Sequence, residues 1–227
     1  MGFVLKNERP ADSPFVETVW RSRSGPAGVF TSVAASNWEM VLVTYGGETT
    51  VTARGPETRP SEAEYPADAE YLGITFELGT FMPHLPIKAL LDRQDMILPE
   101  ASSSSFWLHG SAWELPTFEN AEAFVERLVR REILVRDPVV EAAIRGHAPE
   151  VSVRSLQYRF LRATGLTQKT IRQIERARFA VSLLERGAPI PDAAFGLGYF
   201  DQAHLTNSLK RFVGRTPAQI ARKSAVG

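Results

Sequence analysis

The sequence predicts an α+β protein, with an antiparallel β-rich half followed by an all-α half. Valine, threonine and aromatic residues gather in short runs up to residue 79, and helical periodicity dominates after residue 119. Residues 1–137 carry 12 Lys and Arg against 20 Asp and Glu, whereas residues 138–227 carry 14 against 6. Such an asymmetry is typical of a basic nucleic-acid-binding domain joined to an acidic sensor or partner domain. We therefore expect two domains, 1–137 and 138–227.

The composition excludes several classes of protein. With 227 residues, 44% of them hydrophobic, the chain is long enough for two ordinary cores. It has no cysteine, so disulfides, thiolate chemistry and cysteine-based zinc sites are excluded. No run of 18 apolar residues occurs, and the first 15 residues lack the apolar middle of a signal peptide. We expect a cytoplasmic protein without a membrane partner.

The β-rich half is expected to begin after a loosely attached arm, residues 1–14. Gly46-Gly47 lies between two β-like runs and predicts a tight hairpin. Short strands at this spacing favour a small antiparallel sandwich or barrel. The expected strands are FVETVW (15–20), AGVFTSVAA (27–35), WEMVLVTYGG (38–47), TTVTARG (49–55) and AEYLGITFELG (69–79).

Three segments follow before the second half. Residues 83–100 predict a short helix between prolines, and Ser102–Ser105 predict a flexible loop. Trp107 and Trp113 could line an effector pocket or mark an interface, or simply pack the sheet against the next helix. That helix, 119–135, could pack on its own half or begin the second domain. Its expected inward side chains are Ala121, Phe124, Val125, Leu128 and Leu134; those of 83–100 are Ile87, Leu90 and Leu91.

A helix-turn-helix pattern occupies residues 191–214. Pro191 suits a first helical position, Gly198 permits a tight exit, and Asp201 can cap a second helix that Gly214 ends. This second helix has one apolar face and one small, polar and basic face, which suits the major groove of DNA. The apolar face holds Leu205, Leu209 and Phe212; the opposite face holds Ala203, Asn207, Lys210 and Arg211, with His204 at its edge.

A similar pattern precedes it. Ser152 can cap a helix that Gly165 ends, with Val153, Leu156 and Phe160 expected to be buried. Thr167 can cap a long helix, 168–186, that joins the two patterns. Its roughly 28 Å would set two recognition helices near successive major grooves, about 34 Å apart. The first recognition helix presents Arg154, Ser155, Tyr158 and Arg162, with Gln157 on its flank; the long helix turns Ile171, Ile174, Ala177, Val181 and Leu184 inward.

Three stretches carry a resemblance to a known family: LQYRFLRATGLT, ERARFAVSLLERG and GYFDQAHLTNSLKRFVGRTPAQI. They resemble the DNA-binding domain of the AraC/XylS family of bacterial transcription regulators over about the last 75 residues. The resemblance implies a sequence-specific DNA-binding transcription regulator that responds to a small-molecule effector or a partner. For the first half it implies a cupin-like β-barrel, a likeness at the level of fold alone. It also implies dimerisation as a further role for helix 119–135, beside packing on its own barrel or beginning the DNA-binding domain.

The resemblance also implies which residues meet DNA. The family usually has a basic residue where Tyr158 and Asn207 stand, which leaves the target sequence open. Upstream, either residues 138–145 form the first supporting helix with a stretched turn, or one family helix is shortened. The implied base contacts are Arg154, Gln157, Tyr158, Gln202, Ala203, Thr206 and Asn207, and the implied phosphate contacts are Arg162, Lys210 and Arg211.

The competing hypothesis is an enzyme: a cupin-like catalytic barrel with an accessory helical domain. It requires convergent titratable residues, and none stand at motif spacing in the first half. His84 and His109 form no metal-ligand pair, and FGLGYF lacks the rest of a phosphate-binding loop. We therefore expect no catalytic residues, no metal and no cofactor. A third hypothesis is a first half that only docks another protein, and a homodimer remains open.

Overall fold

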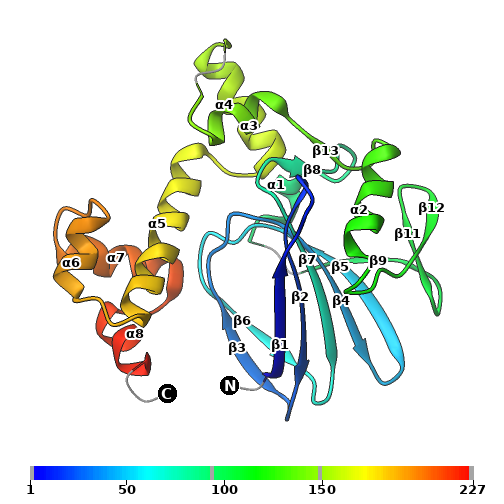
Figure 1. Ribbon diagram of the computed structural model, residues 1–227, viewed down its shortest axis with the longest axis horizontal. Coiled ribbons are helices and arrows are strands. Elements are labelled where there is room, and N and C mark those ends of the chain that lie inside the picture. The colour runs from blue at the N-terminus through cyan, green and yellow to red at the C-terminus, as the bar shows by residue number, and fades with distance from the viewer. Residues whose placement is uncertain (1–2, 93–94, 148–149, 225–227) are drawn as a thin grey trace. The chain divides into compact units, whose positions relative to one another are not determined.

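A computed structural model describes residues 3–92, 95–147 and 150–224. The chain divides into two compact units, whose elements are labelled in Figure 1. Unit 1 comprises Met1–Phe30, Asn37–Pro56 and Ala63–Thr167, and unit 2 comprises Thr31–Ser36, Glu57–Glu62 and Gln168–Gly227. The predicted domain boundary at residue 137 lies within unit 1 and stays a prediction.

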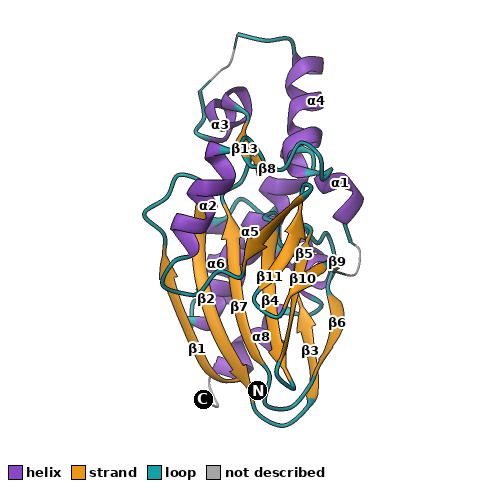
Figure 2. Cartoon of the chain, turned by 90° about the vertical axis from the view of Figure 1, so that its right-hand side faces the viewer, coloured by secondary structure: helices purple, strands orange, loops and turns teal. Residues whose placement is uncertain are grey.

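The main sheet of unit 1 is antiparallel throughout, as Figure 2 shows. An antiparallel β-rich half followed by a helical region is thus confirmed. In the described part of the chain the sheet has two edge strands, the first and the last of its order. That order is β1 (Phe3–Pro10), β2 (Val16–Ser24), β7 (Glu70–Phe76), β4 (Glu39–Tyr45), β5 (Glu48–Arg54) and β9 (Met96–Leu98).

The expectation of a loose N-terminal arm is wrong. β1 pairs with β2 from Phe3 to Pro10. Arg9 of β1 donates hydrogen bonds to both carboxylate oxygens of Glu122 and, at 2.8 Å, to the carbonyl of Phe118. The hydrogen bond from Arg9 lowers the pKa of Glu122. Contacts with residues more than a hundred positions away hold the arm, so its local composition could not reveal the strand.

The predicted hairpin at Gly46-Gly47 is confirmed. Tyr45 pairs with Glu48, and both glycines have positive φ angles, 62° and 85°, as a two-residue hairpin turn of type I′ requires. A further glycine, Gly73 in β7, lies beneath the indole of Trp20. A Cβ atom at this position would meet the ring at 2.0 Å, so the sheet needs glycine there.

Short strands replace two predicted features. Among the described residues of 83–100, 93–94 being outside them, only α1 (Ile87–Leu90) is helical; Leu91 is extended and Asp92 has a φ angle of 52°. The chain then forms β9 on the edge of β5, and the expected serine-rich loop is the turn of a hairpin in which Ser102 pairs with Ser105. The additional pairings are β10 (Glu100–Ser102) with β11 (Ser105–Leu108), β11 with β12 (Ser111–Glu114), β8 (Thr80–Phe81) with β13 (Val135–Arg136), and β3 (Gly28–Ser32) with β6 (Ser61–Tyr65).

Helix α2 (Ala121–Arg130) contacts β2, and the residues of its apolar face are buried. Phe124 and Leu128 are buried as predicted, and Trp113 meets Phe124 edge-on at 5.9 Å. The apolar face of α2 is therefore occupied within its own unit. The helix ends earlier than expected, since Glu132 adopts a left-handed φ of 55°. Leu134 is buried but lies beyond the helix.

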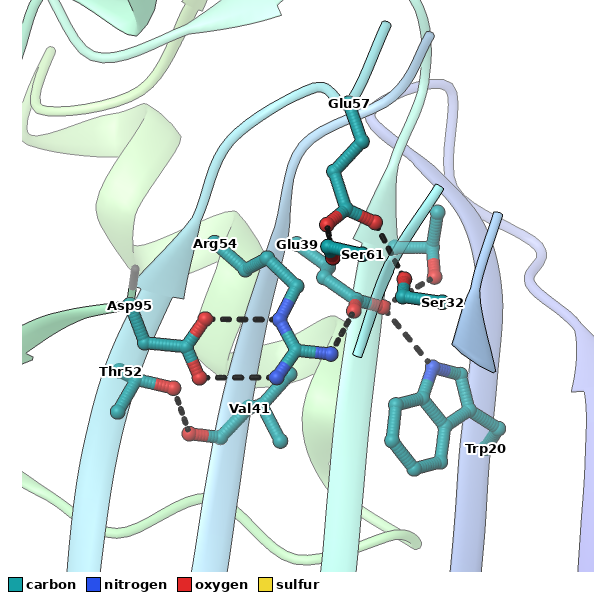
Figure 3. Close-up of polar contacts among 10 residues, drawn as sticks. Trp20, Ser32, Glu39, Val41, Thr52, Arg54, Glu57, Ser61 and Asp95 are labelled. Atoms are coloured by element: carbon teal, nitrogen blue, oxygen red, sulfur yellow. Dashed lines mark hydrogen bonds and ion pairs between the residues drawn. The ribbon is translucent and has the colours of Figure 1, made fainter. Parts of the chain in front are cut away.

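A polar network crosses the face of the main sheet (Figure 3). Arg54 of β5 donates two hydrogen bonds to Asp95, at 2.8 and 2.9 Å, and its Nη1 atom lies 3.6 Å from a carboxylate oxygen of Glu39. The indole of Trp20 donates to Glu39 at 3.3 Å. Burial raises the pKa of Glu39, against the opposing charge of Arg54. The network fastens Asp95, just before β9, to the sheet.

The helices after α2 are divided between the units. Unit 1 keeps α3 (Pro138–Ile144) and α4 (Val153–Thr164); unit 2 holds α5 (Gln168–Glu185), α6 (Ile190–Gly196), α7 (Gln202–Val213) and α8 (Pro217–Ser224). In unit 2, α5 contacts each of the other three helices. Along α5, Ala180 is fully buried, whereas Val181, which was expected inward, is half-buried. None of the described helices has the length and apolarity to cross a bilayer.

Candidate nucleic-acid interface

Helix α7 begins and ends at the predicted residues. The Asp201 carboxylate accepts the backbone N–H of His204 at 2.6 Å, as expected of an N-cap. At the other end Gly214 adopts a left-handed φ of 76°, and its N–H closes the last turn. Both ends of this recognition helix are therefore specified by residues within one turn of it.

The two faces of α7 differ as the periodicity predicts. Leu205, Leu209 and Phe212 are at most 3% exposed and form the packed face. The candidate DNA contacts from this helix lie on its accessible surface, where they could meet bases or phosphates. Gln202, Ala203, Asn207, Lys210 and Arg211 are exposed, and Thr206 is half-buried.

Unit 2 draws a segment from the β-rich half onto the C-terminal end of α7. The backbone N–H of Ala34 donates to the carbonyl of Phe212 at 2.8 Å. This carbonyl is one of the last in the helix and has no partner within it. Ser36 donates from its hydroxyl to the carboxylate of Glu175 on α5. The recognition helix is thus anchored by residues far upstream in the sequence.

Glu57 holds the two upstream segments of unit 2 together, as Figure 3 shows. Its carboxylate accepts hydrogen bonds from Ser32 and, at 2.8 Å, from Ser61. Its backbone exchanges two further hydrogen bonds with Ala35, at 3.0 and 2.9 Å. The segments 31–36 and 57–62 therefore form a bonded pair that belongs to the DNA-binding unit, which no local sequence pattern indicated.

The helix preceding α7 supports its start. Ala193 and Ala194 of α6 are buried, and Gly198 takes a left-handed φ of 69° in the turn. Tyr199 is 4% exposed, and its hydroxyl lies 3.2 Å from Ser208 Oγ on α7. The guanidinium of Arg176 lies 4.3 Å from the centre of the tyrosine ring. α6, turn and α7 form the helix-turn-helix that the sequence predicts.

Helix α4 has the predicted caps. Ser152 accepts the N–H of Ser155 at 3.2 Å, and Gly165 has a φ of 71°. The expected burial of Val153 is wrong, because its side chain is 73% exposed. Phe160 is buried, whereas Val153 and Arg154 in the first turn are exposed and Leu156, also expected to be buried, is half-buried. The predicted base contacts Arg154, Gln157 and Tyr158 are all exposed.

An ion pair fastens α4 to α3. Asp137 is 8% exposed and caps α3 by accepting the N–H groups of Val139 and Val140. Arg159 of α4 donates to both oxygens of the same carboxylate, at 2.9 and 3.2 Å. α3 contacts α4 and is therefore its supporting helix. The turn between them includes residues 148–149, which lie outside the described part.

Arg162, the predicted phosphate contact on α4, is exposed, and its guanidinium lies 5.5 Å from the centre of the Phe81 ring. Gly165 packs on α1, where an added Cβ would meet Ile87 at 3.2 Å. α4 is thus part of unit 1, whereas α7 belongs to unit 2. The spacing of the two recognition helices along one duplex stays a prediction.

Unit 1 also contains a cavity of about 560 Å³ on its main sheet. Leu42 and Leu72 of neighbouring strands contribute apolar surface, and Thr44 and Thr49 contribute hydroxyls. Arg21 donates to Glu119 at 3.3 Å, and its guanidinium lies 4.6 Å from the centre of the Phe118 ring. Sequence reasoning missed this site, because its residues are brought together only by strand order.

The two tryptophans suggested for an effector pocket are not brought together. Phe106 pairs with Trp113 across β11 and β12, so Trp107 points to the opposite face of the hairpin. Trp107 is 46% exposed and Trp113 is 5% exposed. Trp113 borders a second cavity, of about 370 Å³, together with Ala112, Glu114, Arg127, Arg130 and Arg131.

The histidines of the first half lie together. The rings of His84 and His109 are 4.1 Å apart, and burial, with a smaller effect of His109, lowers the pKa of His84. Within the described ranges, no three His, Asp or Glu side chains are grouped so that they could hold a metal ion.

Comparison with known proteins was informative for one part of the chain. Residues 148–223, about a third of the chain, match the family model described as a helix-turn-helix domain. This range includes α4 to α7, with both caps and both recognition helices. No curated protein matches the chain.

Solved structures of ToxT from Vibrio cholerae resemble the chain over nearly its full length. One, at 1.65 Å resolution, is 11% identical with a TM-score of 0.42 and covers 98% of each chain. A second, from strain O395, is 9% identical with a TM-score of 0.39, covering 96% of this chain and 97% of that one. A third, with a bound unsaturated fatty acid, is 9% identical with a TM-score of 0.40, covering 97% and 96%. At such low identities and TM-scores, nothing about the ligand of this chain follows from them.

The family match coincides with the caps, the buried faces and the exposed polar rows of α4 and α7. Residues 148–223 of this chain are therefore a helix-turn-helix domain of the AraC type, and the chain is a DNA-binding transcription regulator.

Proposed function

We propose that the chain recognises a specific DNA sequence through the exposed faces of α4 and α7. The observation that supports this most strongly is the exposed row on α7, on a helix that is capped at both ends and buried behind. The side-chain amide of Asn207 can bond adenine twice, its oxygen accepting from N6–H and its N–H donating to N7, and Gln202 can do the same. Lys210 and Arg211 contact phosphates, as does Arg162 of α4. Arg154, Gln157, Tyr158, Ala203 and Thr206 complete the base-facing set.

The test begins with selection of bound duplexes from a random pool by the full chain. Two enriched elements about ten base pairs apart support two recognition helices, whereas one short element contradicts a role for α4. On the selected site, Asn207→Ala weakens specific binding by about 1 to 3 kcal/mol and leaves binding to random DNA nearly unchanged.

Lys210→Ala separates phosphate binding from base recognition. It weakens binding to both DNAs alike and reduces the slope of log affinity against log salt by about one. Arg186→Ala is the matched control, since it removes an exposed positive charge in the turn after α5, outside both recognition helices. Equal losses on both DNAs for Asn207→Ala would show that this amide does not read a base.

We propose further that a small molecule bound in the 560 Å³ cavity of unit 1 controls DNA binding. The volume suits a small-molecule ligand, and apolar walls with a few convergent polar groups are typical of such sites. Leu42→Trp fills the cavity, whereas Arg130→Ala alters only the smaller cavity beside Trp113. Compounds that raise the melting temperature of the full chain are then tested on both variants. A compound bound at the proposed site no longer raises the melting temperature of Leu42→Trp but still raises that of Arg130→Ala. The opposite pattern assigns the ligand to the site beside Trp113.

The alternative of a catalytic first half makes a different prediction. A compound that raises the melting temperature would then be converted during incubation, or the purified chain would contain a stoichiometric metal. Our proposal predicts neither: the compound is recovered unchanged and alters the affinity for DNA. If no compound shifts melting at all, the third hypothesis, a half that docks another protein, is favoured.

A further inference from the structure

The side chain of Phe200 is the most exposed of the large hydrophobic side chains in the described ranges. It is 93% exposed, directly before the N-cap of α7, whereas its neighbour Tyr199 is 4% exposed. The phenyl ring therefore contributes little to packing within unit 2. A single exposed apolar side chain is common on protein surfaces, so the case for a partner rests on the position of Phe200 beside α7.

The position of Phe200 relative to α7 is fixed by hydrogen bonds on both sides. Its backbone N–H donates to Nδ1 of His204 at 3.3 Å, and the next residue, Asp201, accepts the His204 N–H at 2.6 Å. Tyr199 meets the His204 ring edge-on at 5.2 Å. Phe200 thus has a defined place at the N-terminal end of the recognition helix, although nothing within unit 2 covers its ring.

The location of Phe200 at the N-terminal end of α7 indicates that its partner is a base in the major groove of DNA. Recognition helices of helix-turn-helix domains contact base edges with their N-terminal residues. Among the groups in the major groove, the C5-methyl of thymine is the apolar one, and phenylalanine and alanine are side chains that contact it. Ala203, in the first turn of α7, is also exposed, and its methyl group is a second apolar group at the same end of the helix.

We propose that Phe200, together with Ala203, receives the C5-methyl group of a thymine and so determines specificity at one position of the DNA site. The inference rests on the proposed DNA reading by α7 and adds a contact to it. It assigns a hydrocarbon contact to a side chain outside the polar row of Gln202, Thr206 and Asn207.

Replacement of thymine by deoxyuridine tests this contact, since it removes the methyl group and leaves the base pairing intact. Each thymine of the selected site is replaced in turn, and the dissociation constant of the full chain is measured by fluorescence anisotropy. We expect one position at which the wild-type chain loses about fourfold in affinity, the factor for one methyl-sized apolar group. Phe200→Ala should lose most of this difference between the thymine and uracil forms, keeping only the part that Ala203 contributes.

Two variants control for general effects. Phe195→Ala removes a phenyl group that is 88% exposed on α6, the supporting helix, and should keep the full sensitivity to uracil. Phe200→Leu keeps an apolar side chain and should retain part of the sensitivity to uracil. Because both positions are on the surface, the folded state is expected to tolerate these changes.

Three results would overturn the inference. In the first, no thymine of the selected site is sensitive to uracil. In the second, Phe200→Ala binds more weakly but remains as sensitive as the wild type. In the third, Phe200→Ala binds DNA normally but loses transcription with purified RNA polymerase, which would assign the ring to a protein partner. In each case an unchanged effect of Asn207→Ala on specific binding leaves the proposed DNA recognition standing.

Discussion

The two recognition helices have the same kinds of N-cap and C-cap, but their rear faces are packed differently. α4 and α7 are both 12 residues long, both begin at a capping oxygen and both end at a left-handed glycine. Behind α7, Leu205, Leu209 and Phe212 are almost completely buried. On α4, by contrast, Val153 in the first turn is exposed. An ion pair between Arg159 and Asp137 also attaches this helix to α3.

This difference shows which part of a helix-turn-helix is local. A cap is satisfied by groups within four residues, so the same sequence signal produces the same helix end in either unit. Burial of the rear face depends on what else the unit places there. Two helices with similar patterns can therefore present similar exposed rows although their rear faces are buried to different extents.

The largest expected effect separates the two rear faces. Leu209→Ala on α7 removes a fully buried side chain and should lower the free energy of unfolding of unit 2 by about 2 to 5 kcal/mol. Val153→Ala on α4 should change stability by less than about 0.5 kcal/mol, since that side chain is 73% exposed. Urea unfolding followed by helical circular dichroism measures both. Similar losses would contradict the comparison.

Removal of the ion pair should destabilise unit 1, which contains α4, and leave unit 2 with α7 unchanged. Arg159→Ala leaves the carboxylate of Asp137 without its cation and should destabilise unit 1 by about 1 to 2 kcal/mol, reduced by the 39% exposure of the arginine side chain. Trp20, Trp38, Trp107 and Trp113 all lie in unit 1, so tryptophan fluorescence reports its unfolding. Arg154→Ala, at an exposed position on the same helix, is the control and should leave the transition in place.

The caps should be equivalent. Ser152→Ala and Asp201→Ala each remove one capping hydrogen bond and should each cost about 1 kcal/mol. The first is followed by tryptophan fluorescence and the second by circular dichroism. Glycine at either position, which costs only a few tenths, serves as the control. A much larger loss at Asp201 would show that the cap also supports Tyr199 and Phe200.

The smallest effect is a pH dependence confined to the unit that carries α4. Burial raises the pKa of Glu39, so the folded state keeps its proton at pH values where the unfolded chain has already lost it. This group's contribution to stability is therefore present at low pH and is lost as the pH rises from the ordinary glutamate value through the raised one. Glu39→Gln should remove that slope from urea midpoints measured by fluorescence. An identical slope in the variant would mean that Glu39 is not its origin.

Several details of the fold followed from short sequence patterns. The Gly46-Gly47 turn, the caps at Ser152 and Asp201, and the exposed row of α7 each depend on groups within one or two turns of chain. The errors share the opposite property. The arm became β1 because β2 and Glu122 hold it, and the helix expected at 83–100 shortened because β5 offers an edge to Met96–Leu98.

The candidate site divides in the same way. The family-like spacing placed Arg154, Gln157, Tyr158, Ala203 and Asn207 on exposed helix surface, because helical periodicity alone decides which side a residue takes. It could not reveal the cavity on the sheet, whose lining comes from strands that are neighbours only in space. Nor could it separate Trp107 from Trp113, since their faces depend on the register of one hairpin.

By itself the sequence determined where the recognition helices begin and end and which side of α7 faces outward, since hydrogen bonds and periodicity of a few residues decide both. Only the tertiary structure decided which distant residues pack against these helices and bond to them. The link from Ala34 to Phe212 and that from Ser36 to Glu175 join residues far apart in the chain. Such contacts depend on the packing of the whole unit, because the loss of chain entropy on forming them is offset only when many form together.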